Sequence, residues 1–336
     1  MIAIYGAGQF GKFFYKVIKN YEKIDFFIDK YNYNTFTEGI PVISLKDVKK
    51  HNFKKIYNSV IFFENDVIKD LNGKNIITFV QTLKQYPEII NIFIDGNILW
   101  LNSKTNLLDY TSIKSVRKLL KDEISLNFFD RWIRFRKDFD MDYYPYPTNS
   151  LKEQYFIENL IGESERFVDC GAYIGDTLLN FYDYNKEGKV ICFEPDPTNL
   201  KILNENSKGK DVLIYPMGVG SKTKILKFSA NKGSASHISE DGSVSIAATS
   251  LDEAIYNFRP DYIKMDIEGY ELEALKGAKN IIKDFTPDLA ICIYHKPEDL
   301  WEIPLYIQSI NQNYDFFIRC HSHLCIETVL YCKGKR

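Results

Sequence analysis

The sequence predicts an α/β protein with two units, each built on a mostly parallel sheet flanked by helices. Two observations predict this fold class. Short apolar runs of strand character alternate with helix-like runs along most of the 336 residues, which is typical of parallel sheets with helical crossovers. A glycine-containing turn also links such a strand to a helix twice, at residues 6–11 and 171–175. Turns of this kind approach nucleotides closely.

The first unit is predicted to be a small Rossmann-like domain over residues 1–95. An apolar strand at residues 1–4 leads into a G-x-G-x-x-G turn, a helix, and a second strand that ends in an acidic residue. Such an acid typically meets a ribose in nucleotide-binding folds. The predicted site consists of Gly6, Gly8, Gly11 and Asp29. Its ligand stays open between a nucleotide-sugar, NAD and none, because the segment is short for a complete NAD domain.

Later strands of this unit are expected at residues 55–63, 75–80 and 90–94. Residues 96–150 are predicted to form a helical connector, because apolar residues from about 113 to 135 recur at helical spacing before two prolines.

The second unit, residues 151–336, is organised around the run RFVDCGAYIGDTLLNF at residues 166–181. A buried strand brings Asp169 to its carboxyl end, Gly171 and Gly175 allow a close turn, and Asp176 with Thr177 starts a helix. A second strand, VICFEP, ends at Glu194, where an acid can take both hydroxyls of a ribose.

The remaining elements of this unit follow the same alternation. A third strand at residues 212–217 precedes Gly218 and Val219, and two strands at 223–230 and 243–249 flank a polar loop. A fourth buried strand carries Asp266 at its end and Glu268 in the next turn. The expected elements after it are a helix at 269–283, a strand at 289–294 ending at His295, a helix at 300–310, and an antiparallel hairpin at 316–320 and 327–332. Residues 154–156 are expected to lie beside a substrate site.

Composition narrows the function. A formal net charge of −2 argues against a general nucleic-acid binder. The sequence has no signal pattern and no apolar run long enough for a bilayer, so we expect a cytoplasmic protein without a transmembrane segment. The six cysteines are interpreted as core residues. The cysteines and histidines near the carboxyl end lack zinc-ligand spacing, so no metal is predicted there.

From about Gln154 to Tyr331 the chain resembles the FkbM family of S-adenosylmethionine-dependent methyltransferases. The matching segments are FVDCGAYIGDT, ICFEPDP, DYIKMDIEGYELEALKGA, ICIYHKPEDLWEIPLYI and ETVLY. The resemblance implies a class I methyltransferase fold with a seven-stranded Rossmann-like sheet, and methylation of a hydroxyl on a sugar, glycan or related precursor. Tyr173 departs from the wider class I pattern, in which the turn has a glycine at that position.

The resemblance also implies site residues. Those expected near S-adenosylmethionine are Asp169, Gly171, Ala172, Tyr173, Gly175, Asp176, Thr177, Glu194, Pro195, Gly218, Val219 and Asp266. An alcohol needs a general base, and His295 is the first candidate, Glu268 the second, with Asp266 close to the acceptor or to the cofactor's ammonium group. Asp266 and Glu268 are also possible metal ligands, but no complete ligand set is visible, so no metal is predicted.

Three functions are therefore weighed. The leading one is an O-methyltransferase whose partner is a sugar, nucleotide-sugar or glycan acceptor. The second is an NAD-dependent oxidoreductase or epimerase that uses the amino-terminal turn, and the third is a non-catalytic module with a vestigial cofactor site. A homo-oligomeric state stays open.

Overall fold

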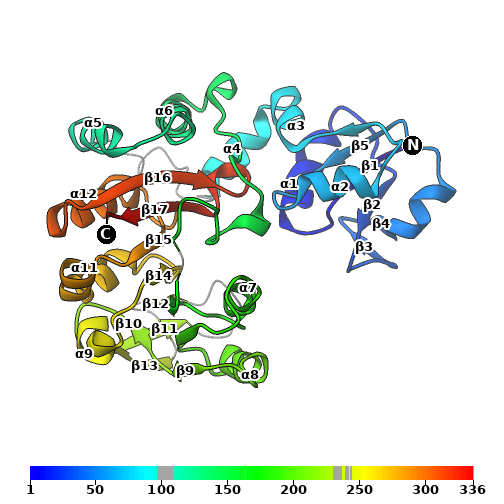
Figure 1. The fold of residues 1–336 in the computed structure, drawn as a ribbon. Coiled ribbons are helices and arrows are strands. Elements are labelled where there is room, and N and C mark those ends of the chain that lie inside the picture. Colours follow the sequence, from blue (N-terminus) through cyan, green and yellow to red (C-terminus); the bar gives the residue numbers. More distant parts are fainter. Residues whose placement is uncertain (97–108, 163, 230–236, 239–241, 243, 336) are drawn as a thin grey trace. The chain divides into compact units, whose positions relative to one another are not determined.

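The computed structural model describes residues 1–96, 109–162, 164–229, 237–238, 242 and 244–335 (Figure 1). The chain forms two compact units. The first consists of Met1–Leu107, Arg131–Tyr146 and Ser322–Leu324, and the second of Leu108–Asp130, Pro147–His321 and Cys325–Arg336. The beginning of the predicted connector, most of the polar loop between 230 and 243, and the start of the strand predicted at 243 lie outside the described residues.

The first unit contains a six-stranded sheet with the order β3-β4-β2-β1-β5-β6. Its strands are β1 (Ile2–Tyr5), β2 (Phe26–Asp29), β3 (Thr35–Thr37), β4 (Ile40–Ser44), β5 (Lys55–Asn58) and β6 (Ile76–Ile77). All neighbours pair in parallel except β3 and β4. This arrangement matches the predicted Rossmann-like architecture, and the β3–β4 hairpin is an addition that the sequence analysis missed.

The helices of the first unit cover this sheet. They are α1 (Gln9–Ile18), α2 (Glu64–Asp70), α3 (Phe79–Gln85) and α4 (Glu88–Asp95), with the 3-10 helix η1 (Leu45–Lys50). The strand predicted at 90–94 is wrong, because α4 occupies that segment. Ile89, Ile90 and Phe93 are buried at helical spacing. The strand predicted at 75–80 is only β6, and α3 begins directly after Thr78, whose side chain caps it.

Several helical segments follow the first sheet. They are α5 (Tyr110–Leu119), α6 (Glu123–Asp138), η3 (Met141–Tyr143) and η4 (Leu151–Glu153). The predicted helical character of this region is thus confirmed for the residues that the structure describes.

The second unit is built on a seven-stranded sheet with the order β16-β17-β15-β14-β7-β8-β9. These strands are β7 (Arg166–Cys170), β8 (Lys189–Phe193), β9 (Val212–Tyr215), β14 (Tyr262–Met265), β15 (Asp288–Cys292), β16 (Tyr314–Cys320) and β17 (Thr328–Gly334). Only β17 runs antiparallel to its neighbours. This is the class I methyltransferase sheet that was predicted.

Helices flank both faces of this sheet. They are α7 (Asp176–Tyr184), α8 (Pro197–Asn206), α9 (Leu251–Ile255), α10 (Glu271–Lys276), α11 (Lys279–Phe285) and α12 (Asp299–Ile310), with η6 (Tyr256–Phe258) and η7 (His323–Cys325) as 3-10 turns. Figure 1 shows α7 and α8 along one face and α11 and α12 along the other. In the core, Phe181 of α7 stacks on Phe167 of β7, which in turn stacks on Tyr262 of β14.

Two details differ from the predictions for this unit. The single helix expected at 269–283 is two helices, α10 and α11. They are separated at Gly277, where a Cβ atom would lie 2.0 Å from the Gly220 carbonyl oxygen. Gly218 and Val219 form β10, which joins β13 (Val244–Thr249), β11 (Lys224–Ser229) and β12 (His237–Ile238) in a separate four-stranded sheet.

Candidate active site

The turn after β7 is held against the end of β14, and this close approach explains Gly171. Gly171 has a φ of +83°, and a Cβ atom there would lie 1.9 Å from the carbonyl oxygen of Asp266. The backbone N–H groups of Gly171 and Ala172 both donate to the Phe193 carbonyl, each at 3.0 Å. The three strand ends of β7, β8 and β14 are therefore tied together by this turn.

Tyr173 and Gly175 complete the turn before α7. Both have positive φ angles, +48° and +88°. Tyr173 thus keeps the left-handed backbone that a glycine at this position would adopt freely. A Cβ atom on Gly175 would lie 2.9 Å from Leu203 Cδ1, so the second glycine allows α7 to approach α8.

Glu194 is buried at the end of β8, and backbone amides surround its carboxylate. The N–H of Tyr173 donates to Oε2 at 2.9 Å and the N–H of Asp196 donates to Oε1 at 2.7 Å. Burial raises the pKa of Glu194 to about 7, although these hydrogen bonds favour the charged form. Glu194 therefore fixes the turn to β8.

Asp169 forms a buried ion pair that the sequence analysis did not predict. Lys264 Nζ lies 3.0 Å from Asp169 Oδ1, and both side chains are almost fully buried. The ammonium group also donates to the Gly171 carbonyl at 2.8 Å. Burial disfavours the ammonium form, but Asp169 and Asp266 outweigh it and raise the pKa of Lys264. Asp169 Oδ2 has no hydrogen-bond partner among the described residues.

Asp266, directly after β14, contacts the side chains of Tyr155 and His295. The Tyr155 hydroxyl donates to Asp266 Oδ2 at 2.9 Å, so the segment 154–156 does reach the predicted site. The charges of Lys264 and His295 outweigh burial and lower the pKa of Asp266. Asp266 therefore carries negative charge between the turn at Gly171 and His295.

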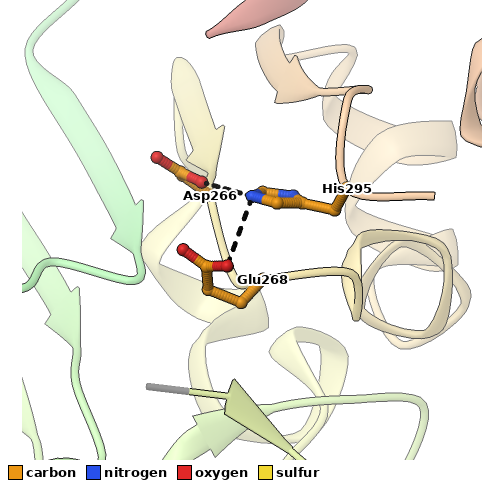
Figure 2. Close-up of side chains that lie close together, drawn as sticks. All are labelled: Asp266, Glu268 and His295. Atoms are coloured by element: carbon orange, nitrogen blue, oxygen red, sulfur yellow. Dashed lines mark ion pairs between the residues drawn. The ribbon is translucent and has the colours of Figure 1, made fainter. Parts of the chain in front are cut away.

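His295 lies in the loop after β15, close to three carboxylates, two of which, Asp266 and Glu268, are drawn in Figure 2. Its Nε2 is 3.4 Å from Asp266 Oδ1 and 3.7 Å from Glu268 Oε2, and its Nδ1 is 3.0 Å from Glu271 Oε1. Neither ring nitrogen makes a hydrogen bond of good geometry within the described residues. The structure thus brings together the three residues predicted for catalysis and adds Glu271.

The electrostatics of this cluster follow from burial and crowding. Burial disfavours the imidazolium, but Glu271, Asp266 and Glu268 outweigh it and raise the pKa of His295 to about 10. Burial, together with Asp266 and Glu271, raises the pKa of Glu268 to about 7, although His295 opposes this shift. The carboxylates around His295 therefore favour its protonated form.

Sequence reasoning missed Lys264 and Glu271, although signals for both were present. Lys264 is a single charge inside the apolar strand YIKM, and a buried lysine needs an acidic partner. Register pairs Lys264 with Asp169 across β14 and β7. Glu271 has a side chain with no exposed surface, and its Oε1 accepts the N–H groups of Ile267 and Gly269. Three acids within one short turn indicated that one of them would be structural.

The predicted amino-terminal site forms a glycine turn in the first unit. Gly6 has a φ of +99°, and a Cβ atom on Gly11 would lie 1.9 Å from the Gly6 carbonyl oxygen. Asp29 accepts the N–H groups of Ala7, Tyr31 and Asn32 at 2.9 to 3.0 Å. These contacts show that Gly6, Gly11 and Asp29 stabilise the backbone of the turn. A nucleotide bound at Gly6, Gly8, Gly11 and Asp29 stays a prediction.

Comparisons with known proteins place this geometry in a family. The family model described as the methyltransferase FkbM domain matches residues 169–318. The hexuronic acid methyltransferase AglP of Haloferax volcanii is 30% identical over 186 residues, which cover 49% of this chain and 76% of that protein. The chain belongs to the FkbM methyltransferase family. A crystal structure of an FkbM methyltransferase from Methylobacillus flagellatus covers 98% of this chain and 89% of its own, with 24% identity and a TM-score of 0.62, and supports the fold.

This FkbM protein is therefore an enzyme, a methyltransferase with S-adenosylmethionine as its cofactor. The residues at the strand ends fit that cofactor. The turn at Gly171 and Gly175 joins the end of β7 to the start of α7, a place where nucleotides bind in such folds, and Glu194 lies at the strand end where an acid can meet a ribose. Asp169 Oδ2 is a buried acceptor without a hydrogen bond, which suits a donor group of the ligand. Membership favours the methyltransferase over both alternative functions.

No helix among the described residues combines the length and the apolar character needed to cross a membrane.

Proposed function

We propose that this FkbM methyltransferase transfers the methyl group of S-adenosylmethionine to a hydroxyl group of a sugar, with sugars that carry a hexuronic acid as the acceptor class. The observation that carries the proposal is the cluster of Asp266, Glu268 and His295 directly beside the cofactor turn. The acceptor class is supported by AglP, whose name gives a hexuronic acid as its substrate.

Methyl transfer from S-adenosylmethionine needs no covalent intermediate with the protein. S-adenosylmethionine supplies a methyl group on a good leaving group when bound, so the enzyme must align the acceptor oxygen with that group and accept a proton. In the proposal, Asp169, Glu194 and the glycine turn hold the cofactor. The sugar hydroxyl lies at the Asp266–Glu268–His295 cluster, where it gives up its proton.

Glu268 and His295 both stay candidates for the group that removes this proton, and His295 can do so only in its neutral form. We expect His295→Gln to keep S-adenosylmethionine binding and to lose at least 100-fold in kcat, since a positioned base contributes about 10²–10⁴ in rate. Calorimetric titration of the cofactor and a turnover assay separate these two effects. Unchanged turnover would remove His295 from the reaction.

An acceptor screen tests the proposal. The purified chain is given S-adenosylmethionine with a methyl label and three matched acceptors: glucose, glucuronic acid, and an oligosaccharide ending in glucuronic acid. Label should enter a uronic acid acceptor as an alkali-stable methyl ether. Label released by mild alkali would mean that the carboxylate is methylated instead of a hydroxyl. Cofactor binding without any labelled sugar would contradict the sugar acceptor. A cytoplasmic location and a homo-oligomeric state stay predictions.

A further inference from the structure

Three atoms of metal-ligating type converge at the end of β14. They are Asp266 Oδ1, Glu268 Oε2 and His295 Nε2, which all lie within 4.8 Å of one another. The nitrogen is 3.4 Å from the aspartate oxygen and 3.7 Å from the glutamate oxygen. Donor atoms that share one ion at about 2.1 Å lie roughly 3 to 3.5 Å apart. The cluster therefore has nearly the spacing of a coordination sphere.

Two of these atoms are buried and have no hydrogen-bond partner. The His295 side chain is only 7% exposed, and neither its Nε2 nor Asp266 Oδ1 makes a hydrogen bond among the described residues. Figure 2 shows the Nε2 edge of the ring turned toward both carboxylates. Unpaired buried polar atoms cost free energy, so their convergence points to a missing partner.

Glu271 orients the ring for such a partner. Its Oε1 lies 3.0 Å from His295 Nδ1 and is itself held by two backbone N–H groups. Metal-binding histidines commonly place one ring nitrogen against a carboxylate, which leaves the other nitrogen for the ion. Here Nε2 is the nitrogen that is left.

The charge of the cluster also favours a cation. Asp266, Glu268 and Glu271 surround one imidazole, and the buried Asp299 and Glu327 add to the electrostatic field on it. Lys264 is already paired with Asp169. A divalent ion between these side chains would balance part of this negative charge.

We propose that Asp266, Glu268 and His295 bind one divalent transition-metal ion. Two carboxylates and one imidazole suit Mn²⁺, Fe²⁺, Co²⁺ or Zn²⁺ better than Ca²⁺, which prefers oxygen ligands throughout. Three protein ligands leave positions for water and for a substrate oxygen.

The role of the ion in catalysis rests on the proposed function. An acceptor hydroxyl bound to the ion has a lower pKa and loses its proton to water. Its oxygen then forms the bond to the methyl carbon while the sulfur–methyl bond breaks and the electron pair stays on sulfur.

Mn²⁺ binding to the metal-free full chain tests the site directly. Electron paramagnetic resonance titration should give one bound Mn²⁺ per chain. Glu268→Gln and His295→Gln should each weaken binding at least 100-fold, because each removes a ligand. Glu271→Gln should weaken it 10- to 100-fold through the orientation of His295. Glu273→Gln is the matched control: it removes a carboxylate from the same helix, one that pairs with Lys276 and Ser221, and should bind as the unsubstituted chain does.

Circular dichroism and S-adenosylmethionine binding show whether each variant is folded, and Glu268, which is 29% exposed, is the variant expected to tolerate replacement best. No stoichiometric Mn²⁺, or equal binding by Glu268→Gln and the control, would overturn the site. A failure of the proposed function is distinguishable from a failure of the metal site. If the proposed function is wrong, Mn²⁺ binds but no sugar is methylated. If the chain methylates sugars equally well after the metal is removed, the proposed function holds and the catalytic role of the ion is refuted.

Discussion

At the scale of single residues, the buried ion pair of Asp169 and Lys264 links stability to the candidate site. Lys264 keeps its charge in a buried place because Asp169 lies 3.0 Å away, Asp266 adds negative charge nearby, and Gly171 offers a carbonyl oxygen. The pair places one charged group at the end of each of two neighbouring strands, and these are the strands that carry the cofactor turn and Asp266. Its removal therefore affects both stability and the site.

We expect Asp169→Asn to lower the free energy of unfolding by roughly 3–5 kcal/mol, because it removes the carboxylate that pairs directly with a buried lysine. Urea denaturation measures this change. The double variant Asp169→Asn with Lys264→Met should recover a large part of the loss, since both partners are then uncharged. A single variant that costs under about 1 kcal/mol would show that the pair is not buried as described.

His321 provides a second residue-scale prediction, on pH. It is buried in the second unit, with Nδ1 2.9 Å from the Ser150 carbonyl oxygen and Nε2 3.1 Å from the Tyr331 hydroxyl. The carbonyl can only accept, so the neutral tautomer with a proton on Nδ1 fits this network. Burial lowers the pKa of His321 to about 4, with Arg319 adding to the effect and Glu153 opposing it.

The lowered pKa of His321 makes the free energy of unfolding depend on pH. Between the unfolded value near pH 6.5 and the folded value, the unfolded chain binds a proton that the folded chain does not, so this contribution to stability is lost as pH falls. The full contribution is roughly 3 kcal/mol. Unfolding free energies of the native chain and His321→Gln, compared from pH 7 to pH 4.5, should converge toward the acid end. A constant difference over that range would contradict the assignment.

At the scale of elements, local sequence patterns predict the glycine turns but not the contacts between separate elements. Glycine turns between a strand and a helix were visible because Gly171 and Gly175 stand at fixed positions after an apolar run. The segment of α4 was misread because a short apolar run fits a strand or a buried helix equally well. Contacts such as that of Lys264 with Asp169 depend on the register of β14 against β7, which no local pattern encodes. The approach of Glu271 to His295 depends in the same way on packing of the start of α10 against the loop after β15.

The turn after β7 gives a prediction at this scale. Gly171→Ala should lower the free energy of unfolding by more than about 3 kcal/mol, because it adds backbone strain and a Cβ atom 1.9 Å from the Asp266 carbonyl oxygen. Gly209→Ala is the matched control, since Gly209 has a φ of +74° with no atom within 4 Å of its Cβ position. The control should cost about 1 kcal/mol. Thermal or urea unfolding compares the two, and equal costs would mean that the close approach at Gly171 is absent.

At the scale of the whole molecule, each unit carries its own glycine turn. In the second unit, the turn lies in the segment that matches the family model, and Glu194 and Asp266, at the ends of β8 and β14, contact it. In the first unit, the contacts of Asp29 are with backbone amides of its own turns. We therefore assign S-adenosylmethionine to the second unit, and a ligand of the first unit stays a prediction.

Ligand-induced stabilisation, measured for cofactors one at a time, tests this assignment most directly. S-adenosylmethionine at a hundred times its dissociation constant should raise the free energy of unfolding of the second unit by about 2.7 kcal/mol. The response should be strongly reduced in a variant that combines Asp169→Asn with Glu194→Gln. An undiminished response in that variant, or no response of the native chain to S-adenosylmethionine, would contradict the placement of the cofactor at the ends of β7 and β8.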